Sequence, residues 1–356
     1  MKTILAIDSF KGCMSSSEVE ETIAGVLNKN GVETLCLPMS DGGEGMLPVF
    51  TSAMSGTLEP VYIHDQMMRR VDAQYGVMPD GTAIIEVAQA CGLTLVKKEE
   101  RNPMRSTTYG VGELLSRAIK RGCRNFIIGL GGTGTSDAGI GMIRALVDIF
   151  ARGKNFDEAL KTELGECRFT LASDVDNPLC GKNGAAHVFA PQKGATPEMV
   201  EQLDRRARLF AEKSALHFGF DKSDEPGAGA AGGLGYAFMQ YLGAEMKSGA
   251  DLLFDLIGFD DKIKDADLII TGEGSADRQT LMGKLPQRIL MRGKQLGVPV
   301  GLVAGGVEDR EELLSAGFSF AESITPEGMP LEEAIKKEVA FSNLRRFATS
   351  LIYEKT

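Results

Sequence analysis

Short apolar and β-branched runs alternate with helical patterns at both ends of this chain, and this alternation limits the fold more than any other feature. Residues 3–7 and 34–38 read as strands, with a helix over residues 15–28 between them. Ser17 and Glu20, three residues apart, fit a capping box in that helix. Further strands are expected at 267–271, 298–304 and 318–324, and further helices at 285–296, 311–316 and 330–352. Strands separated by helices are typical of α/β proteins with a largely parallel sheet.

The last of these helices, over residues 330–352, is amphipathic. Its apolar residues recur at helical spacing. They would line one face of the helix: Leu331, Ile335, Val339, Leu344, Phe347 and Leu351. We therefore expect this face to pack on the core.

The length of 356 residues exceeds what one hydrophobic core usually supports, so two domains are expected. The middle of the chain is less regular, with loops rich in Gly, Asn and Pro between strand candidates at 83–88, 126–130, 169–173 and 187–190. We predict that residues 1–60 and 255–356 form one five-stranded α/β domain and that residues 61–254 form an inserted one. The strand at 126–130 could instead belong to the first domain.

Composition excludes several classes of partner. The net charge is −10 and no Lys or Arg stripe exists, so we expect neither nucleic acid nor an anionic membrane to bind. The apolar run at the start is too short for a signal peptide, and no stretch approaches a membrane span. Six scattered cysteines without a CxxC pair indicate reduced thiols, which favours a cytoplasmic protein.

Four glycine-dense loops also carry acids, hydroxyls or lysines. They cover residues 40–45 (SDGGEG), 129–139 (GLGGTGTSDAG), 227–235 (GAGAAGGLG) and 271–284 (TGEGSADRQTLMGK). Glycine lets the backbone approach a ligand closely, so its N–H groups can converge on an anion. Carboxylates repel a bare phosphate but can hold Mg²⁺, which bridges to one. Glycine mixed with acid therefore indicates a site for a nucleotide and a metal, although each loop alone could be a tight turn.

Nucleotide-binding fingerprints narrow the class of site. No GxxxxGK[ST] exists, so the chain is not a P-loop enzyme. Gly129, Gly131 and Gly134 match GxGxxG after an apolar strand, which keeps open an NAD(P)-dependent oxidoreductase acting on a small hydroxy acid. The acid expected about 20 residues further on, at the end of a second strand, is missing.

The loop over residues 271–284 carries the strongest chemistry. It follows a strand, and ligands of open α/β sheets bind at the carboxyl ends of strands. Glu273 and Asp277 could ligate Mg²⁺, and Lys284 could neutralise a transferring phosphate beside Gly272 and Gly274. The alternative is a capped turn with a solvated Asp277.

The loops after the first two strands reach the same edge of the sheet. Ser9 and Lys11 follow the first strand, and Asp41 follows the second. Lys11 is the natural partner there for a phosphate or carboxylate, unless it is an ordinary surface lysine. Asp41 is expected to bind metal. Glu44 in the same loop could belong to the site or could be a first-turn acid favoured by the helix dipole.

The middle of the chain adds an acid at a strand end. Asp174 follows the strand predicted at 169–173, and its carboxylate suits a general base that accepts a hydroxyl proton. Asp137 could bind metal, although helix capping is the favoured reading of that position. Lys193 lies in a predicted turn and could either bind substrate or simply face solvent.

As a set, these motifs resemble the bacterial-type glycerate kinase family (glycerate kinase I). The resemblance rests on DSFKG at 8–12, DGGEG at 41–45, and the segments 173–195, 226–235 and 267–286. It implies ATP- and Mg²⁺-dependent phosphorylation of D-glycerate, with 2-phosphoglycerate the favoured product. It also implies a flavodoxin-like domain with an inserted second domain. A homodimer is possible.

The resemblance and the residue analysis together give the candidate site. Catalytic candidates are Asp174, Lys11 and Asp277; substrate candidates are Ser9, Lys193, Asp137 and Ser136; nucleotide or phosphate candidates are Gly272, Gly274, Lys284, Gly229 and Gly232; metal candidates are Asp41, Glu273 and Asp277. One loop departs from the family pattern GGSATNDGG, because residues 131–139 read GGTGTSDAG. Ser136 there is shorter than the family's Asn, which could loosen a hydrogen bond to the substrate or nucleotide. An oxidoreductase and a non-catalytic two-domain binding protein remain the alternatives.

Overall fold

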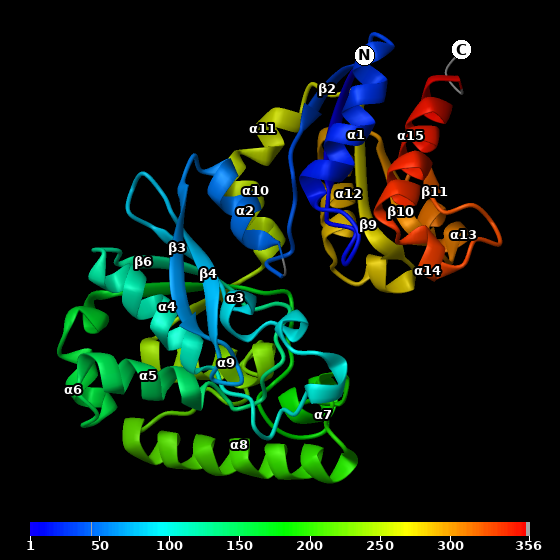
Figure 1. Cartoon of the computed structure of the whole chain (residues 1–356). Coiled ribbons are helices and arrows are strands. Elements are labelled where there is room, and N and C mark those ends of the chain that lie inside the picture. Colours follow the sequence, from blue (N-terminus) through cyan, green and yellow to red (C-terminus); the bar gives the residue numbers. More distant parts are fainter. Residues whose placement is uncertain (44, 354–356) are drawn as a thin grey trace. The chain divides into compact units, whose positions relative to one another are not determined.

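The computed structural model describes residues 1–43 and 45–353 and divides into two compact units (Figure 1). The terminal unit comprises Met1–Asp41 and Ala250–Thr356, and the central unit comprises Gly42–Gly249. The expected domain boundaries lay at 60/61 and 254/255. Residues 42–60 lie in the central unit because strand β3 (Thr57–His64) pairs along its whole length with β4 (Arg70–Val77) of that unit. Glu44 lies outside the described residues.

The terminal unit contains a five-stranded parallel sheet. Its strands are β1 (Lys2–Ile7), β2 (Glu33–Cys36), β9 (Leu268–Ala276), β10 (Val300–Val307) and β11 (Ala321–Ser323), in the order β2-β1-β9-β10-β11. Numbered by their sequence within the unit, this order is 2-1-3-4-5, the flavodoxin-like order. The predicted α/β class and the parallel sheet formed by both chain ends are confirmed.

Helices of the terminal unit pack on both faces of this sheet. They are α1 (Ser16–Lys29), α10 (Gly249–Ile257), α11 (Phe259–Ile263), α12 (Leu285–Leu296), α13 (Arg310–Ser315), α14 (Leu331–Ala334) and α15 (Lys337–Tyr353), with the 3-10 helix η5 (Arg278–Leu281). On one face, α1 and α15 share a core with alternate residues of β1 and β9, including Leu5 and Ile270. On the other, Gly293 of α12 lets that helix approach Val300 and Ile269 closely.

The predicted helix at 330–352 is interrupted. α14 ends at Ala334 and α15 begins at Lys337. Leu344 and Phe347 are buried as the periodicity predicted, but Leu331 is 74% exposed and Ile335 is 48% exposed. Two apolar residues of the expected buried face therefore remain outside the core.

α1 begins two residues earlier than the predicted capping box at Ser17 and Glu20 implied. Ser15 is the N-cap: its Oγ accepts a hydrogen bond from Glu18 N at 3.3 Å, and Glu18 Oε2 accepts one from Ser15 N at 3.0 Å. Glu20 is instead fully buried, where its Oε1 accepts a hydrogen bond from Ile7 N at 2.9 Å. Burial raises the pKa of Glu20 well above its ordinary value.

We expect Glu20→Gln to stabilise the protein at alkaline pH. The folded state holds a proton on Glu20 more tightly than the unfolded state does, so this carboxyl costs stability as pH rises above its unfolded pKa. Gln keeps an acceptor for Ile7 N, and the gain should be about 1–3 kcal/mol at pH 8 and close to zero at pH 4. Urea unfolding at both pH values measures it, with the exposed Glu21→Gln as control. An equal effect at pH 4 and pH 8 would contradict this account.

The central unit contains a mixed six-stranded sheet in the order β3-β4-β5-β6-β7-β8. Beyond β3 and β4, its strands are β5 (Ala83–Glu86), β6 (Asn125–Gly129), β7 (Arg168–Ala172) and β8 (Glu245–Lys247). β3, β4 and β5 pair antiparallel, and β5 to β8 pair parallel. The strand predicted at 126–130 therefore belongs to this unit. The strand predicted at 187–190 is wrong, because Ala185–Phe189 forms helix α7.

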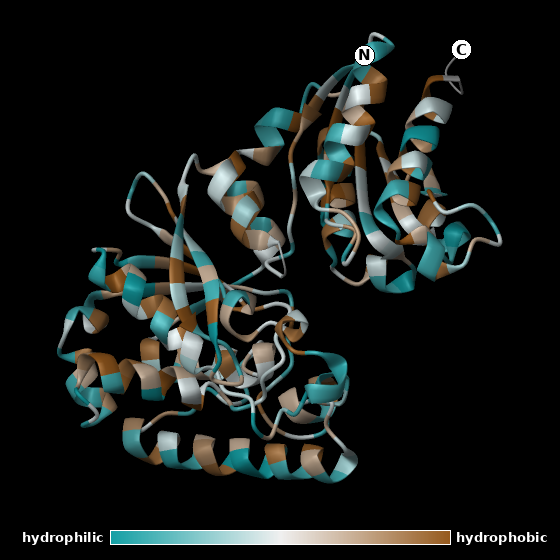
Figure 2. Cartoon of the chain, in the orientation of Figure 1, coloured by the Kyte–Doolittle hydropathy of each residue, from teal (hydrophilic) through white to brown (hydrophobic). Residues whose placement is uncertain are grey.

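The remaining helices of the central unit are α2 (Met46–Ala53), α3 (Ala88–Cys91), α4 (Tyr109–Lys120), α5 (Ile140–Phe150), α6 (Phe156–Leu160), α8 (Pro197–Phe218) and α9 (Ala230–Leu242), with 3-10 turns at Leu93–Leu95, Lys98–Glu100, Glu163–Glu166 and Pro191–Lys193. α8 carries both hydrophobic and hydrophilic residues along its length (Figure 2). Its buried residues recur at helical spacing, including Val200, Leu203 and Ala207.

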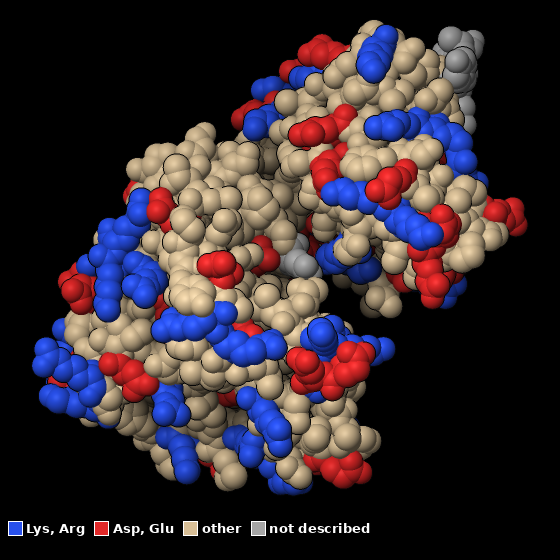
Figure 3. All heavy atoms as spheres, in the orientation of Figure 1, with Lys and Arg blue, Asp and Glu red and all other residues tan. Residues whose placement is uncertain are grey.

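Across the described residues, no helix combines the length and apolar character that crossing a membrane requires. Lys and Arg are interspersed with Asp and Glu on the face shown in Figure 3.

Candidate functional site

The terminal unit gathers acids and lysines at one edge of its sheet. The chain adds strands toward one side of the sheet from β1 to β2 and toward the other side from β9 onward, so the strand order switches between β1 and β9. Ligands of such sheets bind beyond the carboxyl ends of the strands at this switch point. Asp8 follows β1, and Glu273 lies toward the end of β9. Lys11 Nζ lies 3.3 Å from Asp41 Oδ2. We call Asp8, Lys11, Asp41, Glu273 and Lys284 the acid–lysine cluster.

The charges of this cluster act on one another. Burial raises the pKa of Asp8 to about 7, and the neighbouring carboxylates of Asp41 and Glu273 add to this effect against the opposing charge of Lys11. Burial works against the charged form of Lys11, but Asp41 and Asp8 outweigh it and leave the pKa of Lys11 raised. The lysine therefore stays charged at neutral pH beside acids that repel one another. A metal cation could take the place of the lysine beside the acids, and a phosphate could take the place of the acids beside the lysine.

Glu273 and Lys284 are held by the loop that follows β9. Glu273 Oε1 accepts a hydrogen bond from Thr280 Oγ1 at 2.7 Å, and Glu273 Oε2 lies 3.4 Å from Lys284 Nζ. Burial raises the pKa of Glu273 despite these two partners. Asp277 is the N-cap of η5, where its Oδ1 accepts a hydrogen bond from Gln279 N at 2.7 Å. The capped turn weighed for Asp277 is thus present.

The cluster offers oxygen ligands but no complete metal cage. Among residues 1–43 and 45–353, no three His, Cys, Asp or Glu side chains are arranged to hold a metal ion. Mg²⁺ in nucleotide sites is usually bound through one or two carboxylates together with substrate phosphates and water. Carboxylates at a strand-end edge, with lysines beside them, fit that kind of site.

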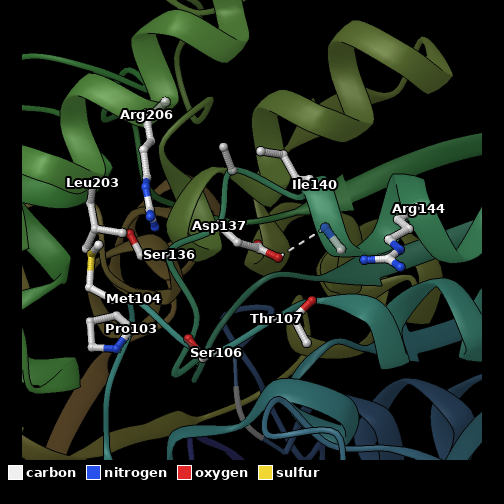
Figure 4. A pocket seen from close by; sticks show the side chains of 13 residues that line it. Pro103, Met104, Ser106, Thr107, Ser136, Asp137, Ile140, Arg144, Leu203 and Arg206 are labelled. Carbon is white, nitrogen blue, oxygen red and sulfur yellow. Dashed lines mark hydrogen bonds between the residues drawn. The ribbon is translucent and has the colours of Figure 1, made fainter.

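The central unit contains a pocket of about 230 Å³, which we call the central pocket. Its polar lining consists of Ser106, Thr107, Ser136, Asp137, Arg144 and Arg206. Figure 4 shows Arg206 beside Ser136 on one side and Arg144 beyond Asp137 on the other. Two cationic side chains with hydroxyl groups suit a small anion that also carries hydroxyls.

Asp137 fixes the start of two helices. Its carboxylate accepts hydrogen bonds from Thr108 N (2.9 Å) and Thr108 Oγ1 (3.0 Å), at the start of α4, and from Gly139 N and Gly141 N (both 3.1 Å), at the start of α5. Burial raises its pKa, which these hydrogen bonds oppose. The capping role favoured by the sequence is therefore present, and the same side chain also lines the central pocket.

Lys193 lies beneath the loop at residues 131–139 rather than in an exposed turn. Its side chain is 3% exposed, and its Nζ donates to Thr135 O at 2.7 Å and to Thr133 Oγ1 at 3.2 Å. Burial lowers the pKa of Lys193 to about 8, although Cys91 and Asp137 act in the other direction. The surface-turn alternative for Lys193 is wrong, because the loop carbonyl and hydroxyl enclose its ammonium group.

Comparison with known proteins identifies the family. A profile described as the glycerate kinase family matches residues 3–353. The chain belongs to the glycerate kinase family. It is 38% identical to a glycerate kinase of Bacillus subtilis (100% of this chain and 99% of the relative) and 36% identical to a glycerate 2-kinase of Escherichia coli (99% and 97%). The crystal structure of a putative glycerate kinase 2 from Salmonella typhimurium superposes with a TM-score of 0.80 at 35% identity, covering 99% of this chain and 98% of that one.

Two glycines of this glycerate kinase family member, which the sequence predicted to bind phosphate, have a packing role. A Cβ at Gly229 would lie 2.3 Å from Pro178 O, and one at Gly232 would lie 2.1 Å from Thr135 O. Gly229 N already donates to Asn177 O at 2.8 Å. Both glycines are buried, and loop backbone of the central unit lies where their side chains would be, so a larger residue would not fit at either position.

Gly272 and Gly274 differ in how closely neighbouring atoms pack against them. A Cβ at Gly272 would lie 2.1 Å from Val303 O of the neighbouring strand, so Gly272 serves strand packing. At Gly274 the nearest atom would be Lys11 N at 3.5 Å, and Gly274 lines a second cavity, in the terminal unit. Gly274 is therefore the one of this pair that can face a ligand.

The GxGxxG match also has a packing explanation. A Cβ at Gly129 would lie 2.8 Å from Gly42 O, and one at Gly134 would lie 2.4 Å from Gln66 Oε1. Protein atoms therefore lie where a side chain at either position would be, and this close approach accounts for both glycines. The family match, rather than this packing, decides against the oxidoreductase alternative.

The remaining candidates lie near strand ends, and one acid was missed. Ser9 follows Asp8, and its N donates to Asp8 Oδ1 at 2.7 Å. Asp174 is exposed just beyond the end of β7, and Ser136 is buried in the wall of the central pocket. Asp8 was not among the site candidates. Its position directly after the first strand, in the motif DSFKG, was the signal that could have found it.

Proposed function

We propose that this chain is an ATP- and Mg²⁺-dependent kinase that phosphorylates D-glycerate, with 2-phosphoglycerate the favoured product. The observation that carries the proposal is the acid–lysine cluster at the point where the flavodoxin-like sheet reverses its strand order. The names of the Bacillus subtilis and Escherichia coli relatives support the acceptor and the product. We further propose a cytoplasmic enzyme, and a homodimer remains possible.

The terminal unit binds the phosphates of ATP. Lys11 and Lys284 pair with phosphate oxygens, and Asp41 and Glu273, with Asp8 beside them, supply the carboxylates for Mg²⁺. The metal would neutralise charge on the phosphates. The lysines hold the same charges in place through their own contacts with the cluster, so the terminal phosphate is oriented before it transfers. Asp277, which is half-buried, remains a further metal candidate.

The central unit binds the acceptor. A pocket of about 230 Å³ suits a small hydroxy acid, and Arg206 and Arg144 supply guanidinium groups for its carboxylate. Ser136 and Asp137 lie between the two arginines, where they can form hydrogen bonds with the hydroxyl groups of the acceptor. Lys193, being buried, contributes by holding the loop that carries Ser136.

Asp174 accepts the proton in this proposal. The acceptor hydroxyl oxygen forms a bond to the terminal phosphorus while the bond from that phosphorus to ADP breaks, and the hydroxyl proton passes to the Asp174 carboxylate. Asp174 follows β7, and the loop that lines the central pocket follows the adjacent strand β6. The Asp174 carboxylate is accessible to solvent, so it can release the accepted proton to water.

Turnover of D-glycerate tests the proposal. The purified chain with ATP, Mg²⁺ and D-glycerate should release ADP in a coupled assay, and phosphorus NMR of the product identifies the phosphorylated hydroxyl. Arg206→Gln should raise the KM for D-glycerate by about 10- to 100-fold, because a charge-assisted contact is lost, and should leave the KM for ATP unchanged. Arg205→Gln, its exposed neighbour on α8, is the control. Absence of turnover on D-glycerate and other small hydroxy acids would refute the function.

A further inference from the structure

The terminal unit contains a second cavity, of about 360 Å³, which we call the strand-end cavity. It opens at the carboxyl ends of four strands: Lys11 follows β1, Gly274 is in β9, Gly306 is in β10 and Thr325 follows β11. This is the edge at which ligands of open parallel sheets bind. Its volume lies in the range of ordinary small-molecule sites and exceeds that of the central pocket.

The walls of this cavity are largely apolar. Phe10 and Ile324 form its buried side, and Leu331 and Ile335 form its outer side. The last two are the apolar residues that the break between α14 and α15 leaves out of the core, 74% and 48% exposed. Large apolar side chains grouped at a cavity mouth are typical of a ligand-binding surface.

Charge continues from this cavity into the acid–lysine cluster. Lys11 belongs to both, since it lines the cavity and its Nζ contacts Asp41. Glu308, the one acid in the lining, lies exposed at the rim. An apolar cavity that leads to a lysine and metal-binding carboxylates fits a ligand with a flat, weakly polar end and a polyphosphate end.

We propose that the strand-end cavity binds the nucleoside of ATP, so that the terminal unit holds the whole nucleotide. The base packs between Phe10 and Ile324 on one side and Leu331 and Ile335 on the other. The ribose lies toward Glu308, whose carboxylate can accept hydrogen bonds from ribose hydroxyls. The phosphates lead past Lys11. This assignment rests on the proposed kinase function for the choice of nucleotide.

Gly306→Val tests the cavity directly. A Cβ at Gly306 would meet no atom within 4 Å, and the position is not in the left-handed region, so valine fills open space without backbone strain. Calorimetry on the whole chain should show the Kd of MgATP raised at least about tenfold, because overpacking excludes the base. The Kd of inorganic tripolyphosphate and the KM for D-glycerate should stay unchanged. Gly25→Val on α1, which also has open space at Cβ, is the matched control.

A second variant keeps the test independent of folding. Leu331→Ala removes an exposed side chain and should weaken MgATP binding by about three- to tenfold, whereas Leu296→Ala, at a position 41% exposed on α12, should not. Unchanged MgATP affinity in Gly306→Val and Leu331→Ala would overturn the assignment, as would equal loss of tripolyphosphate binding. Wild-type protein that binds MgATP through this cavity but does not phosphorylate D-glycerate would refute the function and leave the nucleoside assignment standing.

Discussion

Lys11→Met is expected to lower kcat for D-glycerate phosphorylation by about 10³-fold, because it removes a fixed positive charge from the phosphates in the transition state. Lys11 Nζ lies 3.3 Å from Asp41, and the pKa of Lys11 is raised by its acidic neighbours, so the charge persists over the whole working pH range. Methionine keeps an unbranched side chain as far as Cε, with sulfur in place of Cδ, and lacks the ammonium group. The lysine is 56% exposed, so we expect little change in stability.

Steady-state kinetics and chemical unfolding separate this effect from a structural one. Lys11→Arg keeps the charge and should recover part of the rate. Lys336→Met, an exposed lysine paired with Glu333, should leave kcat unchanged. If Lys11→Met retained kcat within about twofold of wild type, the acid–lysine cluster would not be the place where phosphate transfers.

The acid–lysine cluster of the terminal unit could be predicted because parallel strands bring its residues to one edge of the sheet. Lys11 and Asp41 follow strands β1 and β2, Glu273 lies toward the end of β9, and the carboxyl ends of neighbouring parallel strands share one edge. Once the strands were recognised, the grouping of these residues followed without further information. Asp8 lies at the same edge, but its importance depends on burial and on the nearby carboxylates, which the sequence does not display.

Residues of the central unit were harder to predict because their roles depend on contacts between distant loops. Glycine indicates a close approach but not which atoms approach, and at Gly229 these are atoms of the segment at residues 177–178. Lys193 looked exposed because a turn contains it, yet Thr133 and Thr135 enclose it. Helical periodicity at Leu331 continued across a break that only the fold reveals.

Gly232→Ala is expected to cost about 4 kcal/mol of unfolding free energy, the second large effect. Gly232 has a φ of +69°, and a Cβ there would lie 2.1 Å from Thr135 O and 2.8 Å from Ser136 Cα. Both contacts are to backbone, so no side-chain rotation relieves them. Gly232 O also accepts a hydrogen bond from Ala138 N at 3.0 Å, which ties the two segments together at that spacing.

Gly219→Ala is the matched control, because Gly219 has a φ of +78° and no atom within 4 Å of an added Cβ. Alanine there carries only the left-handed backbone strain, about 1–2 kcal/mol. Urea unfolding of both variants separates the cost of the contact from the cost of backbone strain. Equal losses of unfolding free energy would show that the loop at Thr135 moves aside without cost. The contact also affects the central pocket. Ser136 and Asp137 follow Thr135 and line that pocket, so a displaced loop would move the pocket wall. Any Gly232→Ala protein that folds should therefore show a raised KM for D-glycerate, while its affinity for MgATP, which we propose binds in the terminal unit, stays the same.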